Sequence, residues 1–222
     1  MLILALDAST PVVAVAVARQ EESSREILAE AAVASRGASE ALLPAVHVVL
    51  DLAGESLGDV ERILVGVGPG TFTGIRIAAS TARSLVLGTG AALAGNSTLA
   101  ALAAPALAGG HTDVLAVLDA KRGEVFAQRY TGGDRGGVVC AKPQELPVEG
   151  ASLLVGDGAV RYRDVLSNHG HIPPDGSPLH RVTAAGHVLS ADLMPVAAEA
   201  LVPLYVREPD AEVRRDLNPW SR

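Results

Sequence analysis

The segment whose residue types and spacing best suit ligand binding is a glycine-rich run, residues 66–76, which reads GVGPGTFTGIR. It predicts a strand end, a tight turn and a helix start, where backbone N–H groups can hold an anion. The candidates for a phosphate contact are Gly68, Gly70, Thr71 and Thr73. The run has neither the Lys of the phosphate-loop pattern nor the G-x-G-x-x-G spacing, so neither common nucleotide loop is present. The alternative is a tight turn in which Thr73 caps the helix.

A second candidate is Asp7, which ends the first apolar run and is followed by Ser9 and Thr10. Actin-like and sugar-kinase-like ATPases present an Asp at such a strand end to a metal-bound phosphate, so these three residues are candidates for a phosphate contact. Those ATPases usually have a Gly where this chain has Ser9, whose Cβ narrows the approach of a phosphate. We therefore expect no competent ATP hydrolysis. The alternative is that Asp7 only forms a turn.

The helix predicted after the glycine-rich turn combines a face of small side chains with two arginines. The face consists of Ile75, Ala78, Ala79, Ala82 and Val86. Small side chains let another helix approach closely, so this face is either core or interface. Arg76 and Arg83 lie on one side of the helix about two turns apart. They could meet a carboxylate or a phosphate, and solvated arginines are the alternative.

Residues for nucleophilic or metal chemistry are sparse. Cys140 is the single cysteine, which excludes an internal disulfide and suits a reducing, cytoplasmic compartment. The six histidines are His47, His111, His169, His171, His180 and His187. None forms an H-x-x-x-H pair, so we expect no metal site. Ser9 has no evident His–Asp partnership that would activate it as a nucleophile.

Composition limits the classes of partner. The chain has 222 residues, 49% of them hydrophobic, enough for one large domain or two small ones. A net charge of −7 repels a phosphate backbone and 3% aromatic residues offer few stacking platforms, so a partner chain would hold any RNA. No apolar window is long and clean enough to span a bilayer, so we expect no membrane association.

The elements that must position these residues alternate between strands and helices. In the first half, strands are predicted at 2–8, 12–18, 26–34 and 62–67, helices at 39–52 and 75–87, and a strand–helix pair over 91–107. In the second half, strands are predicted at 114–118, 125–130 and 153–155, turns at 121–123 and 156–158, and a loop at 168–179. This order predicts α/β layers with mixed sheets. Gly109 and Gly110 mark the boundary, and Arg214 and Arg215 belong to a solvated tail.

Four segments resemble the TsaB (YeaZ) family. The run GVGPGTFTGIRIAASTARSL is similar to the family signature G-P-G-S-F-T-G-[LI]-R-I, and the start LALDAST resembles its first strand. LDAKRGEVFAQRY, residues 118–130, resembles the family's D-A-R-R-G-E-V-Y hairpin, and PLYVREPDA, residues 203–211, its closing P-x-Y-x-R segment. The resemblance thus spans nearly the whole chain.

The resemblance implies an actin-like (ASKHA, ribonuclease H-like) fold of two related lobes, residues 1–108 with the dimerisation helices and a smaller lobe of residues 109–222. It also implies a non-catalytic subunit that activates transfer of a threonylcarbamoyl group to the tRNA adenosine next to the anticodon. The expected partners are the catalytic paralogue TsaD, the ATPase TsaE, and a second copy in isolation, with tRNA contacted only through the complex. The implied interface residues on helices 39–52 and 73–87 are Leu42, Leu43, Val46, Ile75, Ala78, Ala79, Ala82 and Val86.

Two other hypotheses stay open at this stage. A free-standing enzyme, either an actin-fold ATP-dependent kinase or a glycopeptidase-like hydrolase, would need an adenosine loop, metal ligands or an activated nucleophile that the sequence does not display. Alternatively, the chain binds no cofactor in isolation, and ADP or ATP binds at the interface with TsaD. In that arrangement the glycine-rich run with Arg76 or Arg83 would complete the pocket.

Overall fold

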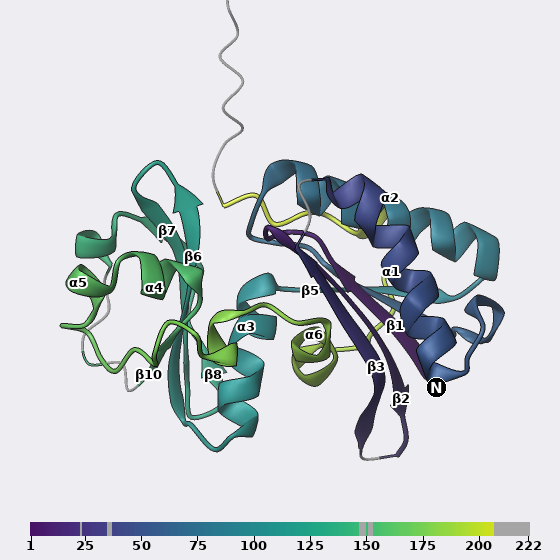
Figure 1. The fold of residues 1–222 in the computed structure, drawn as a ribbon, viewed down its shortest axis with the longest axis horizontal. Helices are drawn as coiled ribbons and strands as arrows, with labels where there is room; N and C mark the ends of the chain where they lie inside the picture. Colours follow the sequence, from purple (N-terminus) through teal and green to yellow (C-terminus); the bar gives the residue numbers. More distant parts are fainter. Residues whose placement is uncertain (23, 35–36, 147–149, 151–152, 207–222) are drawn as a thin grey trace, which may run out of the picture.

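Two β-sheets and three layers of helices make up the molecule (Figure 1). The computed structural model describes residues 1–22, 24–34, 37–146, 150 and 153–206. Across the molecule the layers run helix, sheet, helix, sheet, helix (Figure 1). The predicted solvated tail with Arg214 and Arg215 lies outside the described residues.

The first sheet has the strand order β3-β2-β1-β4-β5. Its strands are β1 (Leu2–Asp7), β2 (Val12–Gln20), β3 (Arg25–Ala34), β4 (Arg62–Gly66) and β5 (Ala92–Asn96). The first three strands form an antiparallel meander, whereas β4 and β5 run parallel to β1. The sheet is therefore mixed, as the sequence predicts, and β1 lies at its centre.

The apolar run of β1 is explained by burial on both faces of this sheet. Leu2, Leu4 and Leu6 pack toward one cluster of buried residues, and Ile3 and Ala5 toward another. Because successive side chains of a strand point to opposite faces, a strand covered on both sides reads as continuously hydrophobic. Asp7 is the first polar residue of this strand, and it lies at the strand's carboxyl end.

Helices α1 (Ala38–Ala53) and α2 (Phe72–Thr89) cover one face of the first sheet (Figure 1). Each ends at a glycine with positive φ, Gly54 at 68° and Gly90 at 74°, a conformation that stops a helix at little cost for glycine. The alternative in which Thr73 caps α2 is wrong. The helix begins at Phe72 with Thr71 at the cap position, because the tight turn ends two residues earlier than predicted.

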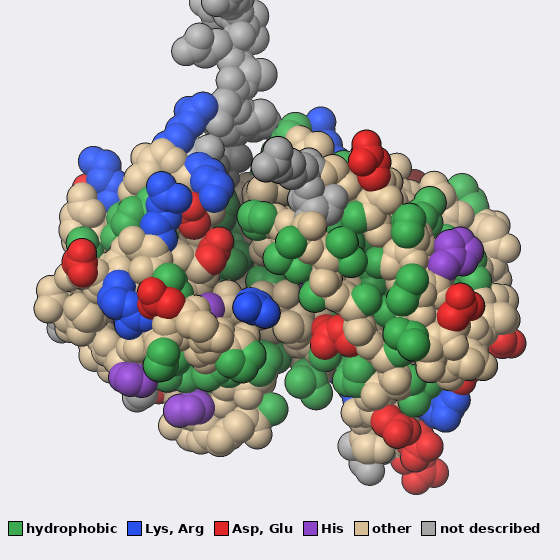
Figure 2. Space-filling view, viewed as in Figure 1, with side chains coloured by type: hydrophobic (Ala, Val, Ile, Leu, Met, Phe, Trp, Pro, Cys, Tyr) green, Lys and Arg blue, Asp and Glu red, His purple; other side chains and the backbone are tan. Residues whose placement is uncertain are grey.

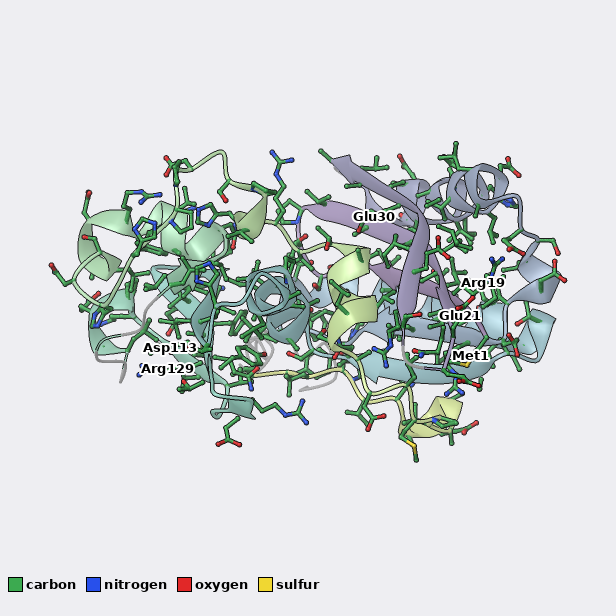
Figure 3. All side chains as sticks on the ribbon, turned by 90° about the horizontal axis from the view of Figure 1, so that it is seen from below. Met1, Arg19, Glu21, Glu30, Asp113 and Arg129 are labelled. Carbon is green, nitrogen blue, oxygen red and sulfur yellow. The ribbon has the colours of Figure 1, made fainter. Side chains whose placement is uncertain are left out.

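The second sheet has the order β10-β6-β7-β8, with β9 paired to β7. Its strands are β6 (Asp113–Lys121), β7 (Glu124–Thr131), β8 (Asp134–Arg135), β9 (Val139–Ala141) and β10 (Leu153–Val155). Strands β6 and β7 form the predicted hairpin, and the ion pair between Asp113 and Arg129 links them, with both oxygens of Asp113 2.8 Å from guanidinium nitrogens (Figure 3).

Short helices cover the outer face of the second sheet. They are α4 (Asp157–Arg161) and α5 (Arg163–Leu166), with the 3-10 turns η2 (Pro143–Glu145) and η3 (Pro178–His180) nearby. The turn predicted over residues 156–158 is instead the start of α4. Gly156 has φ 112°, and a Cβ there would lie 2.0 Å from the carbonyl oxygen of Val117, so the helix starts tightly against β6.

Two helices lie between the sheets, α3 (Thr98–Ala108) and α6 (Ala184–Ser190) (Figure 1). Helix α3 packs on the second sheet, whereas α6 packs on the first, where Glu30 of β3 accepts a hydrogen bond from the N–H of Ala185 at 2.8 Å. Figure 3 shows Glu30 lying toward α6. The chain therefore crosses back from the second sheet to the first near its C-terminal end.

The strap, which we define as residues 191–206, continues along the first sheet and carries the 3-10 turn η4 (Ala198–Ala200). Val196 pairs with Leu93 of β5, and the N–H of Leu204 donates to the carbonyl of Val67 at 2.7 Å.

The division into residues 1–108 and 109–222 stays a prediction. By packing, α6 and the strap contact the first sheet although they follow the predicted boundary. A further 3-10 turn, η1 (Leu57–Asp59), precedes β4.

Candidate functional site

Asp7 lies at the centre of a buried polar cluster at the carboxyl end of β1. Its side chain is fully buried, and Ser9 is 1% exposed. Asp7 Oδ1 accepts hydrogen bonds from the backbone N–H and the hydroxyl of Ser9, both at 2.7 Å. Asp7 Oδ2 accepts from His187 Nε2 at 2.9 Å and from the Thr98 hydroxyl at 3.4 Å. Four donors thus converge on one carboxylate.

The donors come from three separate parts of the chain. Ser9 follows β1, Thr98 begins α3, and His187 lies on α6. The other ring nitrogen of His187, Nδ1, lies 3.3 Å from the amide nitrogen of Asn96, which can donate to it. The cluster therefore fixes the turn after β1 and the two central helices relative to each other.

The cluster keeps Asp7 ionised. Burial raises the pKa of this carboxyl, but the hydrogen bonds from His187 and Ser9 outweigh burial, so the pKa lies below the ordinary 3.8. A carboxyl whose pKa is lower in the folded than in the unfolded state stabilises the fold above its unfolded pKa. This stabilisation is lost as the pH falls through the folded pKa.

We expect the contribution of Asp7 to the free energy of unfolding to be constant between about pH 7 and pH 5 and to decline below about pH 3.8. Urea unfolding at pH 7, 5, 3.5 and 3 measures this decline. Asp7→Asn removes the titrating group, so its stability should fall less steeply with acid than that of the wild type. Equal slopes below pH 4 would show that Asp7 does not contribute to acid sensitivity.

The glycine-rich run packs directly onto the turn that follows Asp7. A Cβ at Gly66 would lie 1.7 Å from Asp7 Oδ2, and one at Gly74 would lie 1.8 Å from the carbonyl oxygen of Ala8. The N–H of Thr71, which could have faced an anion, donates to the carbonyl of Ser9 at 2.7 Å. The run therefore fills the space in front of Asp7 with protein backbone.

The cluster does not have the geometry of a serine hydrolase. In a Ser–His–Asp relay the imidazole lies between the hydroxyl and the carboxylate, so that it can take the proton of the hydroxyl. Here Asp7 lies between Ser9 and His187, and the Ser9 hydroxyl contacts Asp7 and, at 2.9 Å, Thr98. No group of three or more His, Cys, Asp or Glu side chains that could hold a metal ion is found among the described residues.

Arg76 and Arg83, predicted as anion-binding candidates, both contact the strap. Arg83 donates to the carbonyls of Ala198 and Leu201, each at 2.9 Å. The Arg76 guanidinium lies 3.7 Å from the centre of the Phe72 ring and donates to the Tyr205 hydroxyl at 3.2 Å. The two arginines lie on one side of α2, as predicted, where they hold the C-terminal part of the described chain against this helix.

Comparison with known proteins connects this arrangement to a family. Residues 24–145 match the family described as "TsaD: tRNA N6-adenosine threonylcarbamoyltransferase". The tRNA threonylcarbamoyladenosine biosynthesis protein TsaB of Escherichia coli (strain K12) is 31% identical, with 93% of this chain and 95% of that protein covered. An uncharacterized protein of Mycobacterium tuberculosis is 34% identical, with 95% and 93% covered. The structure of YeaZ from Pseudomonas aeruginosa aligns with a TM-score of 0.76 at 27% identity, covering 92% of this chain and 99% of that one.

This chain belongs to the TsaB (YeaZ) family. The resemblance in the four segments is thereby confirmed, and with it the α/β, actin-like fold with two mixed sheets. Membership connects the chain to tRNA threonylcarbamoyladenosine biosynthesis. No helix within the described residues has the length and apolar character needed to cross a membrane.

The structure corrects which residues of the two TsaB helices can face a partner. Seven of the eight predicted interface residues pack into the core beneath α1 and α2: Leu42, Val46, Ile75, Ala78, Ala79 and Ala82 are at most 4% exposed, and Val86 is partly buried. Only Leu43, at 46%, is well exposed. A side chain that already packs against the chain's own sheet cannot also form the contact surface. The prediction that the two helices carry the interface stays a prediction, and it must rest on their exposed side chains.

His187, Thr98 and Asn96 are polar residues of the cluster that the sequence did not single out. His187 appeared only as one of six histidines without metal-ligand spacing. It lies 180 residues from Asp7, and Thr98 lies 91 residues from it. The local signal for Thr98 was its position inside the predicted strand–helix pair over 91–107, and the short helix that carries His187 gave no comparable signal.

Proposed function

We propose that this chain is a non-catalytic subunit that binds the catalytic paralogue TsaD and thereby activates transfer of the threonylcarbamoyl group to the tRNA adenosine next to the anticodon. The ATPase TsaE joins the two. Family membership supports the pathway. The observation that favours a scaffold over an enzyme is the closed cluster around Asp7.

The closed cluster argues against catalysis in the following way. Asp7 and Ser9 are the residues at which an ATPase or hydrolase of this fold would contact its substrate, and neither reaches solvent. Every oxygen of the Asp7 carboxylate already accepts hydrogen bonds from the protein. A phosphate at this place would have to displace both the glycine-rich run and the donors that satisfy Asp7.

The exposed side chains of α1 and α2 support a partner-binding role. The large apolar residues on these helices that reach solvent are Leu43 (46%), Val48 (49%), Leu52 (70%), Phe72 (37%) and Leu87 (87%). Figure 2 shows hydrophobic side chains gathering over α1. Apolar surface of this kind marks contact sites, and self-association through it would cover it in the absence of TsaD. We therefore include a homodimer in isolation in the proposal.

A co-purification experiment with TsaD from the same genome tests this role. We expect Leu52→Lys and Leu87→Lys to weaken the complex at least about tenfold and to lower tRNA threonylcarbamoylation in parallel, since burying a lysine in an apolar contact costs over about 1.4 kcal/mol. Lysine is chosen because both positions lie in the last turn of a helix, where a positive charge is tolerated.

The matched control is Met194→Lys, which alters a residue of similar exposure, 68%, on the strap rather than on α1 or α2. This variant should bind and activate like the wild type. The scaffold proposal fails if the wild type neither binds TsaD nor is needed for modification. The proposal that α1 and α2 form the interface is contradicted if all three variants bind TsaD and support modification to the same extent.

A nucleotide at the interface with TsaD remains part of the proposal, with a narrower set of contacts. Asp7, Ser9 and Gly68 are buried, so the residues of the predicted set that a ligand could reach from solvent are the exposed Thr71, Thr73 and Arg76 and the partly exposed Thr10, Gly70 and Arg83. Titration of ADP and ATP into each subunit and into the complex tests this idea. If TsaD binds ADP or ATP with equal affinity in the presence and absence of this chain, the chain does not contribute to the nucleotide site.

A further inference from the structure

The second lobe contains a cleft that plays no part in the arrangement described above. It lies between the β6–β7 turn, helix α4 and the segment around η3, and its volume is about 390 Å³. Among the described residues, Val160 is the single apolar residue that lines it, and the one aromatic ring, the imidazole of His180, is 7% exposed and contacts the backbone of Gly156 and Pro173 through its two nitrogens. Small-molecule sites are mostly apolar, and base recognition uses aromatic stacking. The lining therefore suits a charged group rather than a nucleobase.

Positive charge lies at the rim of this cleft and negative charge beneath it. Lys121 Nζ and an Arg161 guanidinium nitrogen both contact Asp119 Oδ2, at 2.8 and 3.2 Å. The Asp119 side chain is 3% exposed, whereas those of Lys121 and Arg161 are 58% and 59% exposed. A ligand entering from solvent would thus meet two exposed cations over one buried carboxylate that they already neutralise.

The other charged residues of the cleft leave it with a positive excess at its mouth. The guanidinium of Arg181 is exposed and has no hydrogen-bond or ion-pair partner among the residues that the structure describes. Asp175 is balanced from outside the cleft by Arg163, at 2.6 Å. Asp157 is turned inward, where it accepts a hydrogen bond from the N–H of Asp119 at 3.0 Å. Figure 2 shows lysine and arginine side chains gathering on this lobe.

The backbone of the β6–β7 turn gives an independent indication of function. Lys121 and Arg122 have φ values of 64° and 55°, in the left-handed region that side chains other than Gly, Asn and Asp rarely adopt. Hairpin turns of this conformation ordinarily use Asn-Gly or Gly-Gly. Strained residues of this kind cluster at ligand sites. The two central residues of the turn are Arg122 and Gly123, because Lys121 pairs with Glu124, so Lys121 is the residue of unusual conformation that lines the cleft.

We propose that this cleft binds a phosphate group through Lys121, Arg161 and Arg181. Guanidinium groups bind phosphate through paired hydrogen bonds, and lysine contributes a point charge. The phosphate is presented either by the backbone of a folded RNA or by a free nucleotide. The RNA source rests on the proposed function in tRNA modification, whereas the phosphate site itself does not.

The test uses the full chain alone, without TsaD, and a fluorescently labelled tRNA transcript titrated at several salt concentrations. We expect Arg181→Ala and Arg161→Ala each to weaken binding about fivefold. Each should also lower the slope of log K against log salt by about 0.9, because one phosphate contact is lost. The control Arg135→Ala removes an exposed charge from β8 of the same lobe and should leave both quantities unchanged. Asp175→Asn, which removes an exposed negative charge at the cleft, should tighten binding.

Parallel titrations with ATP and with inorganic phosphate identify the source. Binding of tRNA with this pattern of variants supports an RNA phosphate, and binding of ATP alone with the same pattern supports a nucleotide phosphate. The proposal is overturned if no probe binds at low salt, or if Arg135→Ala weakens binding as much as Arg181→Ala. Because TsaD is absent, such a failure would leave the scaffold proposal unaffected, and a failure to bind TsaD would leave this one unaffected.

Discussion

Asp7→Ala should lower the free energy of unfolding by about 3–5 kcal/mol, one of the largest effects expected for a single substitution in this protein. The substitution removes the acceptor of four buried donors, from Ser9, Thr98 and His187, and none of them can turn to water. Urea or thermal unfolding of the purified variant measures the loss. A loss of this size is a large fraction of the stability of an ordinary domain.

The matched control is Asp51→Ala, which removes an exposed aspartate from α1 and should change the free energy of unfolding by less than about 0.5 kcal/mol. If the two variants are equally stable, the hydrogen bonds to Asp7 do not hold the turn and the central helices together.

The same pair of variants also bears on function, because the scaffold proposal predicts no ATP turnover by the wild type. Turnover by the purified chain that Asp7→Ala abolishes would contradict it.

Ala82→Glu should unfold the protein or reduce it to insoluble material. Ala82 is fully buried on the face of α2 that packs on the first sheet, so the substitution forces a larger and charged side chain into the core. An unpaired buried charge costs several kcal/mol, comparable with the whole stability of a domain. Circular dichroism and the yield of soluble protein measure the outcome.

The control for Ala82→Glu is Ser84→Glu, two residues along the same helix at an exposed position. It should fold like the wild type, with a change in unfolding free energy of under about 1 kcal/mol. A soluble, folded Ala82→Glu variant would mean that this face of α2 is not core. Only then could Ala82 belong to a partner interface, as the sequence suggested.

The elements of residues 1–108 could be predicted from the sequence because each has a strong local pattern. The predicted strand at 12–18 is contained in β2, and the predicted helix at 39–52 lies within α1 with one extra residue at each end. Alternation and 3.6-residue spacing reflect which face of an element is buried, so they predict its type well. The start of α4 was missed because a five-residue helix is too short to establish a spacing.

The interface was predicted less well than the fold, for a physical reason. A stripe of small apolar residues such as Ala78, Ala79 and Ala82 has the same spacing whether it faces the chain's own sheet or another protein. Only the tertiary structure separates the two cases, and it assigns this stripe to the core. The exposed residues of the same helices, such as Leu52 and Leu87, follow no periodic pattern that would have identified them.

The sequence by itself determined the family, the order of strands and helices in residues 1–108, and the position of Asp7 at the end of a buried strand, because these depend on short motifs and local spacing. Only the tertiary structure decided what surrounds Asp7 and what the arginines of α2 contact. His187 reaches Asp7 across 180 residues, and Arg83 reaches Leu201 across 118. Contacts between such distant residues follow from how the layers pack, and no local pattern in the chain records them.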